Sequence, residues 1–473
     1  MLFNSFAYLL AFLPIVILST IAARRILGPL AAQIVVVAAS VVFYGWFRPH
    51  NLWYLGASVT VNFLLAQGIS RAQHPRRKQI LILGLVLNVG YLCIFKYVNF
   101  LIANLWFLDG SHFHLPDLDF PLGISFFTLA QIMYLVDCYE GLAPALSLFD
   151  HITFASFFPY VISGPIAKAK RMAHQFNNFG GTSGERSALI ARGLYQFTIG
   201  LFKKVAFADA FASIANLGFG TKTRLSVPEA WIFSLSYTMQ IYFDFSGYSD
   251  MAIGSAMMLG IEVPRNFDAP LRSKSIIEFW QRWHITLSQF ITTYLYTPIL
   301  KSFERATLFK ASLATLLAMT IAGLWHGPSW TFVLFGVLHG VALVANQYWR
   351  KKKMPKLPAF GSWLLTFVFV NCAFIFFRSN SVHDAVVMTL SLANPHHVFG
   401  GQTLRGVWSS MTGRVLAALL VGTALAFYGK SSDQLAREFE PRYWNSIAVA
   451  TMMVLCWLSL IFNTTQEFVY FKF

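Results

Sequence analysis

Residues 314–340 read ATLLAMTIAGLWHGPSWTFVLFGVLHG, in which two apolar runs are separated by Trp325-His326-Gly327-Pro328. An apolar run of roughly 20 residues is long enough for a helix to cross a membrane. Gly327 and Pro328 predict that the helix ends here and that the backbone opens for close approach. A histidine at membrane depth is costly and suggests a function. The alternative is a core histidine that bonds a neighbouring carbonyl, and we favour the functional interpretation.

The composition extends this pattern to the whole chain. Of 473 residues, 56% are hydrophobic and 12% are charged, and the mean hydropathy is +0.56. A soluble core cannot bury so much apolar surface with so few charges, whereas a bilayer can cover it. We therefore predict an all-α polytopic membrane protein with about 11–13 transmembrane or re-entrant helices. The candidate stretches lie near residues 5–23, 30–47, 52–68, 79–107, 118–136, 147–163, 188–218, 230–261, 309–324, 329–347, 361–377, 413–430 and 446–463.

Positive charges predict the orientation of the chain. The net charge is +16, but the basic residues cluster at the ends of apolar stretches and form no continuous patch for nucleic acid. Examples are Arg24-Arg25, Arg76-Arg77-Lys78 and the run from Arg350 to Lys353. Because basic residues mark cytoplasmic loops, we expect a periplasmic N-terminus. The first stretch lacks a basic lead and a cleavage site, so we expect a retained span and not a signal peptide.

No soluble domain fits between these stretches, so we predict a single membrane domain. It would comprise N-terminal spans at 1–110, a catalytic core at 118–347 and C-terminal spans at 359–473. Polar or glycine- and proline-containing breaks interrupt the core, at 121–125, 163–168, 243–250 and 265–270. Such breaks are tolerated at membrane depth where the backbone lines a cavity or is buried in protein.

Two further histidines lie in apolar surroundings. His284 belongs to SIIEFWQRWHITLSQFITTYLYTPI (275–299), whose aromatic residues recur at helical spacing and predict one amphipathic helix. It could be a second catalytic group or an orienting group. His339 follows His326 in the next apolar run, and a structural role and a functional one suit it equally.

Asp244 and Asp250 lie in FDFSGYSD (243–250), inside a stretch as apolar as a span. They could take part in chemistry or form buried ion pairs, with Arg265, Arg272 or Lys274 as available partners. The four cysteines show no C-x-x-C spacing, which argues against a disulfide framework and a zinc site, and we predict no metal.

These residues are compatible with acyl transfer. A neutral imidazole can remove the proton of a hydroxyl acceptor as it attacks a thioester, and a transient acyl-histidine is also possible. The sequence contains no G-x-S-x-G, Walker or H-E-x-x-H motif, so serine hydrolases, ATPases and zincins have no support.

Six segments together resemble the membrane-bound O-acyltransferases, in the bacterial branch of alginate and peptidoglycan O-acetyltransferase membrane subunits. They are FKYVNF (95–100), PLGISFFTLAQIMYLVD (121–137), FFPYVISGPIAK (157–168), QIYFDFSGYSDMAIG (240–254), NFDAPLRSKSIIEFWQRWHITLS (266–288) and GLWHG (323–327). The resemblance is continuous to about residue 347 and weaker in the last quarter.

The resemblance implies a helical bundle around a central funnel, with His326 as the catalytic residue and His284 as its companion. It implies an acyl thioester donor from the cytoplasm, acetyl-CoA in the acetylating branch, and no bound cofactor. The acyl group would pass to a periplasmic SGNH-type acetyltransferase that modifies a polysaccharide. The expected tunnel residues are Trp283, Trp325, Asp244, Tyr248 and Asp250, and the donor phosphates would favour Lys168, Lys170, Arg171, Arg272 and Lys274.

One departure limits what the resemblance implies. Many relatives carry an Arg-Asp pair where this chain has Thr292-Thr293, and their glycine- and arginine-rich loop is replaced here by LKSFERATLFK (300–310). Partner or substrate therefore need not match the alginate case. D-alanyl transfer to teichoic acid from a carrier protein is the nearest alternative. A transporter or flippase also suits broken helices, although we find no inverted repeat.

Overall fold

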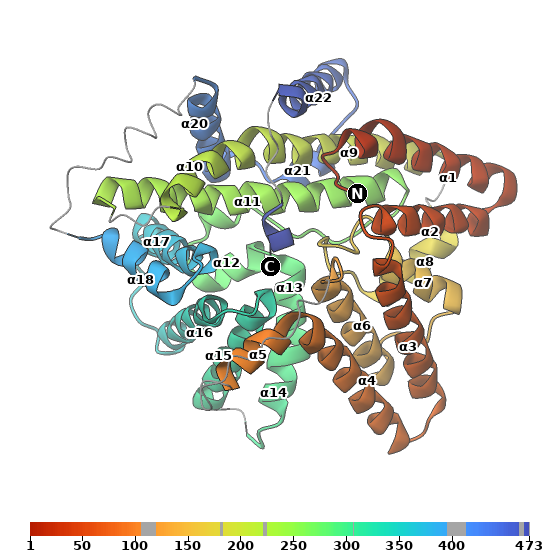
Figure 1. Ribbon diagram of the computed structural model, residues 1–473, viewed down its shortest axis with the longest axis horizontal. Helices are drawn as coiled ribbons and strands as arrows, with labels where there is room; N and C mark the ends of the chain where they lie inside the picture. Colours follow the sequence, from red (N-terminus) through yellow and green to blue (C-terminus); the bar gives the residue numbers. More distant parts are fainter. Residues whose placement is uncertain are drawn as a thin grey trace. The chain divides into compact units, whose positions relative to one another are not determined.

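The computed structural model describes residues 1–105, 120–179, 183–220, 225–305, 307–394, 413–462 and 468–472. Over these ranges the regular structure is helical and no strand is present, which confirms the predicted all-α class (Figure 1). Four histidines of polar stretches lie outside the described residues: His112, His114, His396 and His397.

Seven described helices or continuous helical segments are long and apolar enough to cross a membrane, so the chain is a multi-pass membrane protein. They are Ala7–Leu27, Asn51–Arg71, Arg76–Asn104, Leu308–His326, Trp330–Lys351, Ala359–Arg378 and Tyr443–Phe462. Three shorter apolar helices span Pro29–Gly45, Ile124–Tyr139 and Val415–Tyr428. The other predicted stretches also form helices, but these are not among the ten apolar helices above. One of them, α7 (Leu148–Ser156), has nine residues and is too short to cross a membrane.

Three of the four predicted breaks are confirmed, and one is wrong. Residues 121–123, 163–168 and 265–269 are non-helical, and Gly123 starts α6 with a positive φ of 76°. Residues 243–250, in contrast, lie inside one uninterrupted helix, α11 (Val227–Met258). Both aspartates have buried partners, Lys204 for Asp244 and Gln196 for Asp250, so polarity alone did not end the helix.

The chain forms two compact units, which are described separately. The first comprises Met1–Leu201, Tyr248–Arg265 and Ala436–Val449. Its helices are η1 (Ala7–Phe12), α1 (Leu13–Leu27), α2 (Pro29–Gly45), α3 (Asn51–Arg71), α4 (Arg76–Leu92), η2 (Cys93–Tyr97), α5 (Val98–Leu105), α6 (Ile124–Tyr139), α7, α8 (Ala169–Asn178) and α9 (Ser183–Phe202). Helices α3, α4 and α6 pack together, as Figure 1 shows. Buried rings, including Tyr8, Phe43 and Phe158, form an aromatic core.

The second unit comprises Phe202–Gly247, Asn266–Leu435 and Ala450–Phe473. Its described helices are η4 (Lys203–Ala208), α10 (Asp209–Phe219), η5 (Pro270–Arg272), α12 (Ile276–Arg282), α13 (Ile285–Phe290), η6 (Ile291–Tyr296), α14 (Thr297–Lys301), α15 (Leu308–His326), α16 (Trp330–Lys351), α17 (Ala359–Arg378), α18 (Val382–Ser391), α20 (Gly413–Tyr428), α21 (Ser432–Arg437) and η8 (Val469–Lys472). Helices α11, α21 and α22 (Tyr443–Phe462) contribute residues to both units, and Phe202 at the end of α9 belongs to the second.

Helices α15 and α16 are consecutive, pack tightly against each other and form a helical hairpin around the Trp-His-Gly-Pro break. A Cβ on Gly323 would lie 2.7 Å from the Cα of Gly336, so only glycine lets the two backbones approach so closely. The break itself is confirmed: α15 ends at His326, and Ser329 caps α16 by accepting a hydrogen bond from the Thr331 N–H at 3.3 Å. His326 is therefore fixed at a helix end.

Candidate active site

His326 lies in a box of aromatic rings within the second unit and is 6% exposed. Its ring centroid is 4.9 Å from that of Trp325, 5.0 Å from Phe377, 5.8 Å from Tyr470 and 6.0 Å from Phe335. An imidazole so enclosed is shielded from bulk water, and its orientation is fixed by ring packing. This environment suits a base that acts on a bound hydroxyl.

His284 is completely buried and sits at a break that the sequence did not predict. We expected one amphipathic helix over 275–299, but α12 ends at Arg282 and α13 starts at Ile285. His284 between them has a positive φ of 42°, which is rare for a side-chain-bearing residue and typical of functional sites. The break has a tertiary cause. The Ile285 N–H donates to the Asn266 carbonyl at 2.9 Å, and the Asp268 N–H donates to the Arg282 carbonyl at 2.9 Å.

Asn266 fixes the tautomer of His284. The Asn266 Oδ1 accepts from the Thr286 backbone N–H at 3.3 Å and from the Thr286 hydroxyl at 2.9 Å, which identifies this atom as the oxygen. The Nδ1 of His284, 3.1 Å away, must then be the donor. The other ring nitrogen, Nε2, consequently carries the lone pair. Burial lowers the pKa of His284 to about 3, so the ring is neutral at physiological pH.

Two aromatic side chains connect the surroundings of the two histidines. Trp325 lies 4.9 Å from His326 and 6.5 Å from His284 between ring centroids. Phe245 of α11 lies 4.7 Å from His284 and 4.2 Å from Tyr470. The structure therefore brings the two predicted histidines and Trp325 into one aromatic cluster. Trp283 packs beside it, against Phe267, Phe279 and Phe374.

Asp244 is buried and forms an ion pair, but not with the predicted partners. The Lys204 Nζ lies 2.9 Å from Asp244 and 3.0 Å from Asp209. The other Asp244 oxygen accepts a hydrogen bond from the Val469 N–H at 2.8 Å, which places Tyr470 beside His326. Arg272, a suggested partner, instead donates to the carbonyl of Gly429. Asp244 thus holds the segment that completes the aromatic box.

The other predicted site residues are described within their own units. Tyr248 and Asp250 belong to the first unit, where Tyr248 packs against Phe3 and Asp250 accepts a hydrogen bond from Gln196. Also in the first unit, three candidates for donor binding are exposed at the start of α8: Lys168, Lys170 and Arg171. Lys274 is exposed in the second unit, at the start of α12. Among the described residues, no group of three or more histidine, cysteine or acidic side chains could hold a metal ion.

Several residues that form or support the aromatic cluster were not predicted from the sequence. Asn266, Lys204 and Tyr470 are remote in sequence from the groups that they contact. Asn266 does lie in the predicted break at 265–270 and begins the segment 266–288 that resembles the family, but neither signal gave it a role. Tyr470 lies outside every predicted span.

Known proteins match this chain over both histidine segments. The model of the MBOAT, membrane-bound O-acyltransferase family matches residues 78–382. A peptidoglycan O-acetyltransferase of Helicobacter pylori is 34% identical, over 100% of this chain and 98% of the relative. A protein of Azotobacter vinelandii named Probable alginate O-acetylase is 34% identical, over 91% of this chain and 85% of its own. A teichoic acid D-alanyltransferase of Bacillus subtilis is 27% identical, over 60% of this chain and 75% of its own.

Proposed function

Because this chain belongs to the membrane-bound O-acyltransferase family, we propose that it transfers acetyl groups for the O-acetylation of an extracytoplasmic polysaccharide. It is a multi-pass membrane protein and an O-acyltransferase. We also propose that it lies in the bacterial inner membrane with a periplasmic N-terminus.

The observation that carries the proposal is the shared aromatic cluster of His326 and His284. His326 would act as a general base on the acceptor oxygen. That oxygen attacks the thioester carbonyl, the carbon–sulfur bond breaks, and the thiolate leaves with the proton that the imidazole has taken. A transient acyl-histidine would give the same products in two steps. The lone pair on His284 Nε2 would accept a hydrogen bond from a reactant and orient it. Trp283 and Trp325 would line the reactant path.

The relatives support acetyl over D-alanyl as the transferred group. The peptidoglycan O-acetyltransferase matches essentially end to end, whereas the D-alanyltransferase matches only 60% of this chain at lower identity. We propose acetyl-CoA as the donor, with no bound cofactor. Lys168, Lys170, Arg171, Arg272 and Lys274 remain the candidates for its phosphates. By the resemblance to this branch, a periplasmic SGNH-type acetyltransferase would receive the acetyl group.

The test is acetyl transfer by membrane vesicles that contain the chain together with its polysaccharide. His326→Ala should lower the transfer of labelled acetyl from acetyl-CoA by about 10²–10⁴-fold, the usual contribution of a general base. His383→Ala is the matched control, because His383 is an exposed histidine of α18.

Full acetylation by a folded and inserted His326→Ala protein would refute the role of His326. Consumption of carrier-bound D-alanine in place of labelled acetyl-CoA would instead identify the D-alanyl branch.

A further inference from the structure

A cavity of about 700 Å³ lies in the second unit, apart from the aromatic box of His326. Four segments enclose it: the start of α12, the second half of α16, residues 356–357 of the connection between α16 and α17, and α17 from Ala359 to Phe369. Its volume falls in the range of small-molecule sites. Both α16 and α17 are long and apolar enough to cross a membrane, so the cavity lies along two candidate membrane spans.

The lining of this cavity is amphiphilic. Lys274 and Lys356 are exposed and contribute two positive charges. Ala345, Leu365 and Phe369 provide an apolar wall, and Leu365 is 63% exposed. A ligand that satisfies both parts needs an anionic group and a hydrocarbon chain.

Two further side chains that line the cavity suit contact with a lipid headgroup. The Trp349 indole is 40% exposed and donates to the Pro355 carbonyl at 3.1 Å, so it is held at the cavity, and tryptophan is enriched at the depth of lipid headgroups. The side-chain oxygen of Asn346 is buried at the cavity, and among the described residues it has no hydrogen-bond partner. A rotation of this side chain would present the oxygen to a headgroup hydroxyl, from which it would accept a hydrogen bond.

We propose that this cavity binds an anionic phospholipid with a hydroxyl-bearing headgroup, of the phosphatidylglycerol type. The phosphate would lie between Lys274 and Lys356, and an acyl chain would follow the apolar wall. Lys274 would then bind the lipid, and the donor phosphates would be left to the other four basic candidates. Helix α16 ends in Arg350 and Lys351, and Lys352 and Lys353 follow, which indicates the cytoplasmic side, where anionic lipids attract basic segments. A free nucleotide phosphate would satisfy the lysines but would leave the apolar wall uncovered.

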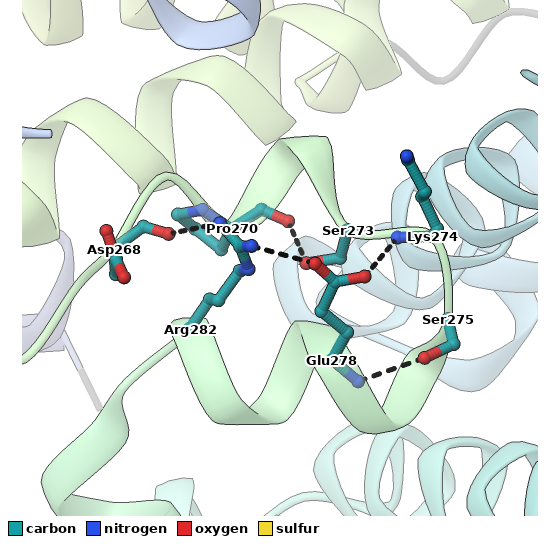
Figure 2. Close-up of polar contacts among 7 residues, drawn as sticks. All are labelled: Asp268, Pro270, Ser273, Lys274, Ser275, Glu278 and Arg282. Atoms are coloured by element: carbon teal, nitrogen blue, oxygen red, sulfur yellow. Dashed lines mark hydrogen bonds and ion pairs between the residues drawn. The ribbon is translucent and has the colours of Figure 1, made fainter. Parts of the chain in front are cut away.

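The proposed headgroup site is continuous with a polar network at the start of α12 (Figure 2). The Lys274 backbone N–H donates to Glu278 Oε2 at 2.8 Å, and Arg282 pairs with Glu278 Oε1 at 2.9 Å. Ser275, which also lines the cavity, caps α12 by accepting from the Glu278 N–H at 3.1 Å. A lipid bound here would stabilise α12, the helix that ends directly before Trp283 and His284.

The experiment measures phosphatidylglycerol binding to the full chain in detergent by native mass spectrometry, with phosphatidylcholine as the net-neutral lipid. Replacing both lysines, Lys274→Gln with Lys356→Gln, should weaken phosphatidylglycerol binding by about tenfold or more, given what one surface lysine contributes near anionic lipid. The matched control is Lys351→Gln with Lys352→Gln, which removes two charges beside the cavity that do not line it. It should change binding less than twofold.

A second variant tests the apolar wall without touching a charge. Ala345→Trp should fill the groove and weaken binding at least fivefold, and a thermal-unfolding scan checks that each variant is folded. Equal losses in the two lysine double variants would overturn the proposal, because binding would then follow general surface charge. Competitive displacement of the lipid by CoA would also overturn it and would assign the cavity to the donor. Acetyl transfer is not the readout, so the lipid site and the proposed function fail separately.

Discussion

The indole N–H of Trp280 donates a hydrogen bond to Nδ1 of His339 across 3.2 Å. His339 is completely buried in α16, and the ring of Phe279 stacks on it at 6.0 Å between centroids. Because Nδ1 accepts, the proton of this imidazole lies on Nε2. The contact ties α12, which precedes His284, to α16, which follows His326. A structural role for His339, one of two that the sequence left open, is thereby favoured.

Trp280→Phe should lower the free energy of unfolding by about 1–3 kcal/mol, because the buried Nδ1 of His339 loses its donor. A double-mutant cycle with His339→Phe in detergent solution measures the coupling, which we expect to be at least 0.5 kcal/mol. Additive effects of the two substitutions would contradict the role of the bond. His383→Phe, at an exposed site of α18, serves as the control.

Asn266→Ala should reduce acyl transfer by about 10–100-fold, by analogy with the loss seen when the outer hydrogen-bond partner of a metal-bound histidine is removed. The His284 ring would lose the acceptor that fixes its tautomer. Asn266→Asp keeps an acceptor in place and should retain more activity. The measurement is kcat and KM for both variants, and the loss should appear in kcat. Unchanged kcat in Asn266→Ala would show that the His284 tautomer is irrelevant to transfer.

Because His284 is buried, we expect the free energy of unfolding to fall as the pH is lowered. Its pKa is lowered to about 3 in the folded protein by burial, whereas an ordinary histidine titrates at 6.5. Above pH 6.5 the ring is neutral in both states and contributes nothing to this dependence. As the pH falls below 6.5, the unfolded chain binds the proton first, so stability decreases by about 1.4 kcal/mol per pH unit until the folded pKa is reached. The slope of unfolding free energy against pH between 6 and 4 should be shallower by this amount in His284→Gln, and an identical slope would disprove the shift.

Lys204→Met should destabilise the protein by about 3–5 kcal/mol, because Asp244 and Asp209 would lose the buried ammonium between them. Adding Asp244→Asn should recover part of the loss, since the amide oxygen can still accept from the Val469 N–H while the buried charge is removed. Lys204→Arg keeps the charge and is the matched control. Thermal unfolding in detergent compares the three. No recovery in the double variant would mean that the pair does not act as a unit.

Much of the fold follows from the sequence because its signals are local. The apolar lengths predicted a polytopic all-α membrane protein, and Gly327-Pro328 predicted the end of α15 at His326. A proline removes a helical N–H wherever it occurs, so such a break does not depend on distant residues. Polar residues inside a helix are a weaker signal, and the break expected at 243–250 is absent from α11.

By itself, then, the sequence determined that the chain is a membrane protein, that His326 stands at a helix break, and which family its motifs resemble. The tertiary structure decided the surroundings of both histidines. Backbone hydrogen bonds from residues 266–268 end α12 and hold His284 in a left-handed conformation, although its own segment has helical periodicity. Lys204 pairs with Asp244, and η8 brings Tyr470 to His326. Helical periodicity reports one buried face, whereas partners remote in sequence are selected by packing and by the cost of leaving a buried polar group unpaired.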